Sequence, residues 1–315
     1  MILTRVREVL MILVADVIEY NDERFHDLTI PDTQIQELHS DCLWSEGPVW
    51  FNESQTLIWS DIPNQRLLSW NENRGVTVFR KDSNFSNGNT RDLEGNLVTC
   101  EHGTRRITRT EVDGTISVIA DNYNGKKLNS PNDVVVKSDG SIWFTDPDYG
   151  ILSDYEGYKS DMEQPGCFVY RVDPKNGAVH IVADDFKKPN GLAFSEDETT
   201  LYISDSGQSH DPNGPHHIKA FDVVEGCKLK NGKIFVDVSP GVPDGIRVDI
   251  HGNIWSSCKN GVICFDPMGN KLGKIKIPQI VSNLTFGGDK RNRLFITATH
   301  SLYAVYIASS GIQNS

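Results

Sequence analysis

The chain has 315 residues and a formal net charge of −12, from 43 acidic and 31 basic side chains. Nucleic acids and anionic membrane surfaces repel an acidic protein of this kind, so neither is expected as a partner. The chain contains no low-complexity tract and no Ser/Gly/Pro linker, and we therefore predict one main domain.

The N-terminal segment carries an apolar run from Val9 to Ile18 that Asp16 interrupts. The run is too short to span a bilayer, and no small-residue cleavage site of a signal peptide follows it. We expect a short helix here, or a stretch upstream of the true start, within an N-terminal extension of residues 1–31. The cytoplasm is the expected compartment, with the periplasm or secretion as alternatives.

Six cysteines are spread along the chain without a CxxC pair, and four of them fall in predicted strands. Buried free thiols are therefore expected rather than disulfides or a cysteine metal site. The six are Cys42, Cys100, Cys167, Cys227, Cys258 and Cys264. The sequence does not indicate an oligomeric state.

After a short predicted strand at Gln34–Leu38, the chain repeats one β-hairpin six times. In the clearest copy, Val134 and Val136 alternate before a Ser-Asp-Gly turn, and Ile142 and Phe144 alternate after it. In every copy an acidic or amide residue stands eight positions before the turn. These lead residues are Glu46, Asn87, Asn132, Asn190, Asp244 and Asn283.

The lead residues are 39 to 58 residues apart, a spacing that fits the four-stranded blade of a β-propeller. Third and fourth strands can be assigned after each hairpin, but the sixth unit runs out of chain after three strands. We therefore predict an all-β fold, a six-bladed β-propeller of four-stranded antiparallel blades over residues 32–307, with a C-terminal tail of residues 308–315. The strand at Gln34–Leu38 is expected to complete the sixth blade and close the ring, which hides the edges of an open stack.

The first strand of each propeller blade surrounds the central channel, so the six lead residues should form a ring at one mouth. Their side chains are two carboxylates and four amides, and such oxygen donors suit Ca²⁺, or Mg²⁺ and Mn²⁺ with retained waters. Convergent polar groups in a concavity are typical of a small-molecule site. The alternative is that each Asn or Asp only begins a strand or fills a turn, which explains one or two such residues better than six.

Further polar groups are predicted at the same mouth. Second strands end in an acidic residue in four units, at Asp61, Glu101, Asp146 and Asp205. Most of these acids are expected to accept hydrogen bonds from backbone amides of neighbouring blades. Two long loops, residues 150–166 and 206–216, are polar and aromatic, which is typical of a substrate lid but also of a mobile surface loop.

Short motifs follow one another in a fixed order from about Asp22 to Ile307. They are Trp44–Trp50, Trp59–Asn64, Gly88–Asp92, Cys100–Gly103, Ser130–Asp133, Trp143–Pro147, Lys188–Leu192 and Pro243–Ile246. Together they resemble the gluconolactonase, regucalcin (senescence marker protein) and luciferin-regenerating enzyme family of six-bladed propellers. Each motif alone has low specificity, whereas their order and spacing are specific. The Asn-Thr stretch after Gly88 and the Cys-Glu-His-Gly stretch from Cys100 are most similar to the bacterial gluconolactonase branch.

The resemblance implies one divalent metal ion and the hydrolysis of a small sugar lactone at that ion. Ca²⁺ is the expected metal, with Mg²⁺, Mn²⁺ or Zn²⁺ as alternatives. The implied metal ligands are Glu46, Asn132, Asn190 and Asp244.

One position departs from the family pattern. Animal regucalcins have an arginine that contacts sugar hydroxyls where this chain has Ser130, so substrate contacts are expected elsewhere. The candidates for substrate binding are Asn87, Arg91, His102, Asp133 and Tyr149, each of which also has an ordinary structural explanation.

The expected mechanism uses the metal as a Lewis acid on the lactone carbonyl and as an activator of bound water. Asp244, the predicted catalytic residue, or one of the second-strand acids would accept the proton of the water. No Gly-x-Ser-x-Gly elbow is present, so no serine nucleophile is predicted. Two alternatives remain open: a calcium-dependent esterase or phosphotriesterase on the same propeller, and a non-catalytic calcium-binding propeller.

Overall fold

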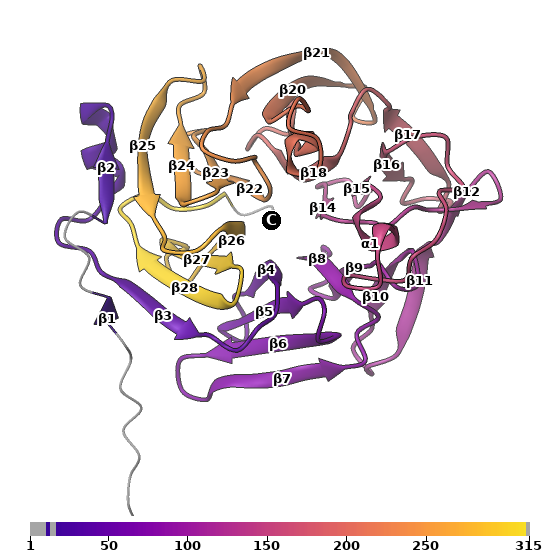
Figure 1. Ribbon diagram of the computed structural model, residues 1–315, viewed down its shortest axis with the longest axis horizontal. Coiled ribbons are helices and arrows are strands. Elements are labelled where there is room, and N and C mark those ends of the chain that lie inside the picture. Colours follow the sequence, from indigo (N-terminus) through magenta and orange to yellow (C-terminus); the bar gives the residue numbers. More distant parts are fainter. Residues whose placement is uncertain (1–10, 13–16, 313–315) are drawn as a thin grey trace, which may run out of the picture.

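Six antiparallel sheets are arranged around a central axis, each with its first strand innermost (Figure 1). The computed structural model describes residues 11–12 and 17–312, with side chains from Val17 onward. This arrangement confirms the predicted six-bladed β-propeller of four-stranded blades. The register of the third blade confirms the predicted hairpin, because Val134 pairs with Phe144 and Val136 pairs with Ile142.

The first three blades follow one another along the chain. Blade 1 contains β4 (Ser45–Phe51), β5 (Thr56–Asp61), β6 (Arg66–Asn71) and β7 (Gly75–Lys81). Blade 2 contains β8 (Ser86–Arg91), β9 (Leu97–Glu101), β10 (Arg106–Thr110) and β11 (Ile116–Ala120). Blade 3 contains β14 (Val134–Val136), β15 (Ile142–Asp146), β16 (Phe168–Val172) and β17 (Val179–Ala183). A two-stranded hairpin, β12 (Asn122–Tyr123) and β13 (Lys126–Lys127), connects blades 2 and 3.

The last three blades complete the ring. Blade 4 contains β18 (Pro189–Phe194), β19 (Thr200–Asp205), β20 (His217–Val224) and β21 (Lys228–Asp237). Blade 5 contains β22 (Ile246–Val248), β23 (Ile254–Cys258), β24 (Gly261–Phe265) and β25 (Lys271–Lys276). Blade 6 contains β26 (Val281–Gly287), β27 (Arg293–Ala298), β28 (Ser301–Tyr306) and, from the N-terminal part of the chain, β3 (Ile35–His39). Three short helical turns lie between strands: η1 (Glu23–Leu28), α1 (Tyr149–Leu152) and η2 (Gly207–Ser209).

Blade 6 is closed by the strand that the sequence predicts for this role. β3 pairs antiparallel with β28, and Leu302 lies opposite His39 while Ala304 lies opposite Gln36. The last blade therefore joins the two ends of the propeller, and the hydrogen bonds of β3 hold the ring shut.

The N-terminal segment adds strands instead of the expected helix. β1 (Met11–Ile12) pairs with β3, and β2 (Ile18–Tyr20) pairs with β25 at the outer edge of blade 5. The helix prediction is therefore wrong for the described part of Val9 to Ile18. Outer blade edges carry unpaired backbone groups, and pairing with them outweighs a local helical preference.

The far end of the chain is packed as well. Residues 308–312 run beside blade 5, where Ile250 N donates to Ser310 O (2.9 Å) and Ile312 N donates to Val248 O (3.3 Å). The Ile312 side chain is buried. The described part of the predicted tail therefore belongs to the packed structure.

Neighbouring blades are held together by aromatic side chains. Trp50 of blade 1 stacks on Phe295 of blade 6 with ring centroids 5.3 Å apart, and Trp143 of blade 3 meets Phe194 of blade 4 at 5.4 Å. Buried rings of this size contribute most of the apolar area between two sheets. The result is a rigid frame around the channel.

Two composition-based expectations can be compared with the structure. All six cysteines are free thiols, and five of them are buried while Cys227 is partly exposed, which confirms the prediction of buried free thiols for those five. Within residues 11–12 and 17–312, none of the helices has both the length and the apolar character needed to cross a bilayer.

Candidate metal and substrate site

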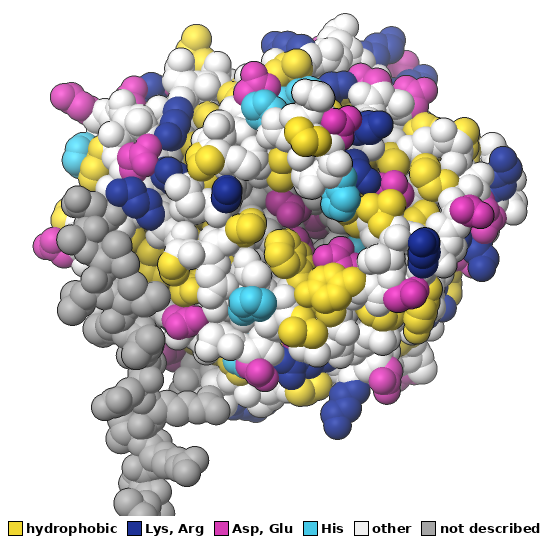
Figure 2. Space-filling model, viewed as in Figure 1, with side chains coloured by type: hydrophobic (Ala, Val, Ile, Leu, Met, Phe, Trp, Pro, Cys, Tyr) yellow, Lys and Arg dark blue, Asp and Glu magenta, His cyan; other side chains and the backbone are white. Residues whose placement is uncertain are grey.

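Five of the six lead residues line one pocket at the mouth of the channel, as the hairpin repeat predicts. The pocket has a volume of about 290 Å³, close to the lower limit of small-molecule sites. Figure 2 shows it as a hollow near the centre of this face, with acidic side chains at its floor. The lead residues that line it are Glu46, Asn87, Asn132, Asn190 and Asp244, and Tyr149 lines it too.

Close backbone packing between blades brings these side chains together. The residue after Asn190 is Gly191, and its N–H donates to the carbonyl oxygen of Asp244 in the next blade (3.1 Å). A Cβ at Gly191 would lie 2.3 Å from that oxygen, so only glycine allows this approach. The contact fixes the spacing of Asn190 and Asp244 at the mouth.

Glu46 is the carboxylate on the blade 1 side of the pocket. Its Oε2 accepts hydrogen bonds from Gly47 N (2.8 Å) and from Asn283 Nδ2 (3.3 Å). The pKa of Glu46 is raised to about 8, mainly by burial and also by the neighbouring carboxylate of Asp133, while these two hydrogen bonds oppose the shift. Among the described residues, the Glu46 carboxylate therefore has no ion pair with a Lys or Arg side chain that would stabilise its negative charge.

Asp244 faces Glu46 from the blade 5 side. Its backbone N donates to Ser257 Oγ (2.8 Å), which holds the residue just before β22. Burial raises the pKa of Asp244 well above its ordinary value, and the charges of Glu46, Asp133 and Glu156 raise it further. A hydrogen bond from Asn190 acts in the opposite direction.

The floor of the pocket is a buried polar network across the channel. Asn283, the sixth lead residue, donates from Nδ2 to both Glu46 Oε2 and Asp133 Oδ2, each at 3.3 Å. Arg247 Nη1 lies 3.9 Å from Asp133 Oδ2 and donates to Ile246 O (2.7 Å). Arg247 therefore supplies the positive charge beneath the acids, and Asn283 and Asp133 support the site from below rather than line it.

The candidate metal ligands fit a hard divalent cation. Asn190 Oδ1 is buried at the pocket without a hydrogen-bond partner among the described residues, and the charge of Glu46 raises the pKa of Asp244. An unsatisfied carbonyl oxygen beside two repelling carboxylates is a donor set that Ca²⁺ prefers. Residues 17–312 hold no metal-binding group of three or more His, Cys, Asp or Glu side chains, and the set here is instead two carboxylates with two amides.

Asn87 and His102 form the wall next to the ligands. His102 Nδ1 lies 3.0 Å from the carbonyl oxygen of Glu156 and must donate to it, so Nε2 accepts from Asn87 Nδ2 at 3.2 Å. Burial lowers the pKa of His102 to about 4, so the ring is neutral near pH 7. This neutral tautomer orients the Asn87 amide, and His102 itself lies behind the pocket wall.

Tyr149 lies on the opposite wall and connects the two long loops. Its hydroxyl lies 3.0 Å from Ser209 Oγ, and its ring is 5.4 Å from that of His210. Lys188 Nζ lies 4.9 Å from the centre of the Tyr149 ring and pairs with Asp148. Both predicted lid loops therefore contribute side chains to the pocket.

The structure does not bring Arg91 to the pocket. Arg91 ends β8, whereas Asn87 lies near its start, and its guanidinium pairs with the exposed Glu53 at 2.8 Å. Ser130, which stands where animal regucalcins have an arginine, is buried and accepts from Gly150 N (2.9 Å) while it donates to Pro147 O (2.6 Å).

Three of the four second-strand acids bind backbone N–H groups, as expected, but in the segment entering their own blade. Asp61 accepts from Leu43 N (2.9 Å), and Asp146 accepts from Asn129 N (2.8 Å). Asp205 accepts from the N–H groups of residues 187 and 188. Glu101 differs, because its carboxylate accepts from the side chains of residues 84, 104, 106 and 108.

A family model described as the SMP-30/gluconolactonase/LRE-like region matches residues 44–300. The chain belongs to this family. A gluconolactonase of Zymomonas mobilis is 34% identical over 89% of this chain and 83% of its own length. A solved structure of a gluconolactonase from Xanthomonas campestris is 38% identical, with a TM-score of 0.88 over 97% of this chain and 100% of its own. Bovine regucalcin is 27% identical over 82% of this chain and 84% of its own length, so the gluconolactonase branch is the more similar, as the motifs predict.

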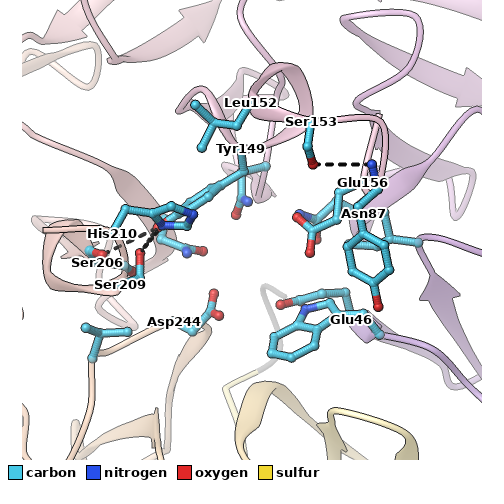
Figure 3. Close-up of a pocket in the computed structure, with 16 residues that line it drawn as sticks. Glu46, Asn87, Tyr149, Leu152, Ser153, Glu156, Ser206, Ser209, His210 and Asp244 are labelled. Carbon is cyan, nitrogen blue, oxygen red and sulfur yellow. Dashed lines mark hydrogen bonds between the residues drawn. The ribbon is translucent and has the colours of Figure 1, made fainter. Parts of the chain in front are cut away.

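Within this SMP-30/gluconolactonase/LRE-like propeller, two charged residues of the site are not predicted by the sequence patterns. Arg247 falls inside a strand pattern and gives no signal of its own. Glu156 lies in the loop of residues 150–166, which the sequence marks as a candidate lid without singling out this carboxylate. Figure 3 shows Glu156 at the pocket beside Asn87, across the cavity from Asp244.

Proposed function

We propose that this protein is a metal-dependent hydrolase that opens small sugar lactones to their hydroxy acids. The observation that carries the proposal is the convergence of Glu46, Asn132, Asn190 and Asp244 on one small pocket, with Asn190 Oδ1 left unpartnered within the described residues. The gluconolactonases among the relatives support a lactone hydrolase as the enzyme class.

In the proposed site those same four residues hold the metal. A divalent cation, with Ca²⁺ favoured by the hard oxygen donors, would offset the charges of the two carboxylates and polarise the lactone carbonyl. Glu46 is fixed for this role by Gly47 N and Asn283, and Asn190 by its hydrogen bond to Asp244. Arg247 and Asp133 hold the floor of the site in place from below.

Asp244 is the proposed proton acceptor. Its carboxyl lies at the pocket, and it interacts with the charges of Glu46 and Glu156 from the other walls. A base in this position takes the proton of the attacking water as the water oxygen bonds to the lactone carbonyl carbon. The Asn190 amide keeps the Asp244 carboxyl oriented for that transfer.

The proposed substrate contacts come from the walls of the pocket. Asn87, oriented by His102, presents its amide to the cavity, and Tyr149 lines the opposite wall. A volume of about 290 Å³ is suited to a ligand of one sugar ring rather than to an oligosaccharide. We omit Arg91 from the proposed contacts because its guanidinium is bound to Glu53 at the other end of β8.

The test compares Asp244→Ala and Asn190→Ala with the unchanged protein. Each variant is expected to lose most of its calcium-dependent turnover of glucono-1,5-lactone while it keeps the circular dichroism spectrum of a folded propeller. Asp237→Ala, which removes an exposed carboxylate at the end of β21, is the matched control and should keep full activity. Full activity in both site variants would refute the assignment.

The same assay separates lactone hydrolysis from the two alternatives. Aryl esters and phosphotriesters are tested beside the lactone, with EDTA and with Ca²⁺ added back. Turnover of the lactone that EDTA abolishes supports the proposal. A preference for aryl esters or phosphotriesters, or no turnover of any substrate, would overturn it.

A further inference from the structure

Glu156 has a carboxyl at the pocket that the roles above do not use. It lies in the loop between α1 and β16 and lines the cavity next to Asn87 (Figure 3). Within the described residues its carboxyl makes no hydrogen bond and no ion pair, and burial alone accounts for its shifted pKa. Burial of a carboxyl without a hydrogen-bond partner or a counter-charge costs free energy of folding, so such a group is uncommon in a folded protein.

The loop is seated so that this side chain is aimed at the cavity. A Cβ at Gly150 would lie 2.5 Å from His102 Cβ, and a Cβ at Gly157 would lie 2.0 Å from Gly150 O. Two glycines therefore let the loop fold back on itself and rest on His102. The hydrogen bond from His102 Nδ1 to Glu156 O then fixes the backbone at Glu156 (3.0 Å).

Two further contacts hold the loop against the propeller. The Tyr158 ring meets Phe85 edge to face at 5.2 Å, and Gly150 N donates to Ser130 Oγ at 2.9 Å. Ser130 thus helps to hold the loop that carries Glu156. These contacts fix the backbone of the loop at Glu156, whose side chain lines the pocket.

In the described part of the chain, no cation beside Glu156 opposes the effect of burial on its carboxyl. The charged side chains that interact with it are Glu46 on β4 and Asp244 before β22, both acidic, and Tyr155 is its neighbour in the loop. The adjacent ring of His102 is neutral, and no described cation contributes to its titration. Burial raises the pKa of Glu156 to about 7, a value suited to an acid catalyst.

Lactone opening needs two proton transfers, and the site holds two carboxyls on facing walls. We propose that Glu156 is the general acid that protonates the ring oxygen of the lactone as the acyl C–O bond breaks. This inference rests on the proposed function and adds to it the group that completes the reaction.

The atoms balance as follows. The water oxygen bonds to the carbonyl carbon, and Asp244 takes the proton that the water loses. The acyl C–O bond breaks, its electron pair stays on the ring oxygen, and Glu156 gives that oxygen a proton. The product is the hydroxy acid, and solvent returns one proton to Glu156 as Asp244 releases one.

The test uses leaving groups of different basicity. Glu156→Gln keeps the size of the side chain but cannot donate the proton. It is expected to reduce kcat on glucono-1,5-lactone by about 100-fold, the usual contribution of a general acid. On the corresponding thiolactone, whose thiolate leaves without protonation, the loss should be much smaller. In the unchanged protein, kcat/KM is expected to fall on the alkaline side of the pH profile, and this alkaline limb should disappear in the variant.

Asp161→Asn is the matched control, because it neutralises an exposed carboxylate of the same loop and should leave all these quantities unchanged. An unchanged kcat in Glu156→Gln, or an equal loss on lactone and thiolactone with the pH limb retained, overturns the role of Glu156 while lactone hydrolysis stands. If the unchanged protein opens no lactone, the proposed function itself is refuted, and the role of Glu156 as general acid is refuted as well.

Discussion

The side-chain amide of Asn190 hydrogen-bonds the carboxyl of Asp244, and its own Oδ1 has no partner within the described residues. One side chain thus orients the proposed base and offers a free oxygen to the pocket. A buried carbonyl oxygen without a partner costs free energy of folding, and a bound cation would recover that cost.

The first prediction concerns metal affinity at this pair. Asn190→Ala removes the free oxygen and should weaken Ca²⁺ binding by about tenfold or more, measured by titration calorimetry on chelated protein. Asn253→Ala is the control, because Asn253 is also a buried amide that binds an aspartate, Asp249, yet it does not line the pocket. Equal affinity in Asn190→Ala and the unchanged protein would exclude Asn190 as a ligand.

The second prediction concerns His102 as a neutral positioning residue. His102→Phe removes the acceptor for Asn87 Nδ2 and the donor to Glu156 O, and KM for the lactone should rise about tenfold, as expected for a lost buried hydrogen bond. Because the pKa of His102 is lowered to about 4, the ring should contribute no inflection to the activity profile near pH 6.5. Proton NMR of the ring checks this value directly.

For this second prediction, His180→Phe is the control, since His180 is exposed on β17. A normal KM in His102→Phe would show that Asn87 does not need the histidine. An imidazole that titrates near pH 6.5 would contradict the buried neutral tautomer.

The third prediction concerns stability and pH in the metal-free protein. In the folded protein the pKa of Glu46 is raised to about 8 and that of Glu156 to about 7, whereas the ordinary value of a glutamate is 4.5. The folded state therefore binds more protons than the unfolded state between pH 4.5 and 8. Stability should therefore be highest near pH 5 and fall as the pH rises through 8. Thermal unfolding in EDTA at pH 5, 6, 7 and 8 measures this trend.

Excess Ca²⁺ should make the melting temperature less dependent on pH, because the ion binds the charged carboxylates of the folded state and releases their protons. Glu156→Gln should remove the contribution of Glu156 to the loss, which falls between pH 4.5 and 7, and should leave the contribution of Glu46 in place. A melting temperature in EDTA that stays constant or rises from pH 5 to 8 would contradict the burial of these acids.

The fold and most of the ring could be predicted because both follow from a local pattern. Val134 and Val136 pair with Phe144 and Ile142 across a Ser-Asp-Gly turn, so the hairpin register is encoded locally, and a lead residue at a fixed offset from the turn lies at the channel mouth. Arg91 shows that two residues close in sequence on one strand do not always lie at the same site. It is four residues from Asn87 on one strand, and a rise of about 3.3 Å per residue places it roughly 13 Å away.

Other features depend on long-range packing and have no local signal. The aim of Glu156 results from the contact of Gly150 with His102, two residues that lie in different blades. The strand at Ile18–Tyr20 forms because the outer edge of blade 5 offers unpaired backbone groups, which an apolar run alone does not reveal.

The last prediction concerns Arg247 and Asp133 beneath the pocket. Both side chains are buried, and Nη1 of Arg247 lies 3.9 Å from Oδ2 of Asp133. Arg247→Met leaves Asp133 and Glu46 without a nearby cation and should lower the free energy of unfolding by about 3 kcal/mol, as for other broken buried pairs. Urea unfolding in EDTA measures the change.

Asp133→Asn combined with Arg247→Met should lower the free energy of unfolding by less than the sum of the two single substitutions, because neither partner is then left as an isolated charge. Arg247→Lys is the control, since it keeps the charge and should retain part of the stability. Additive losses in the double variant would mean that Arg247 stabilises the channel by packing alone. This result would contradict a stabilising charge interaction between Arg247 and Asp133.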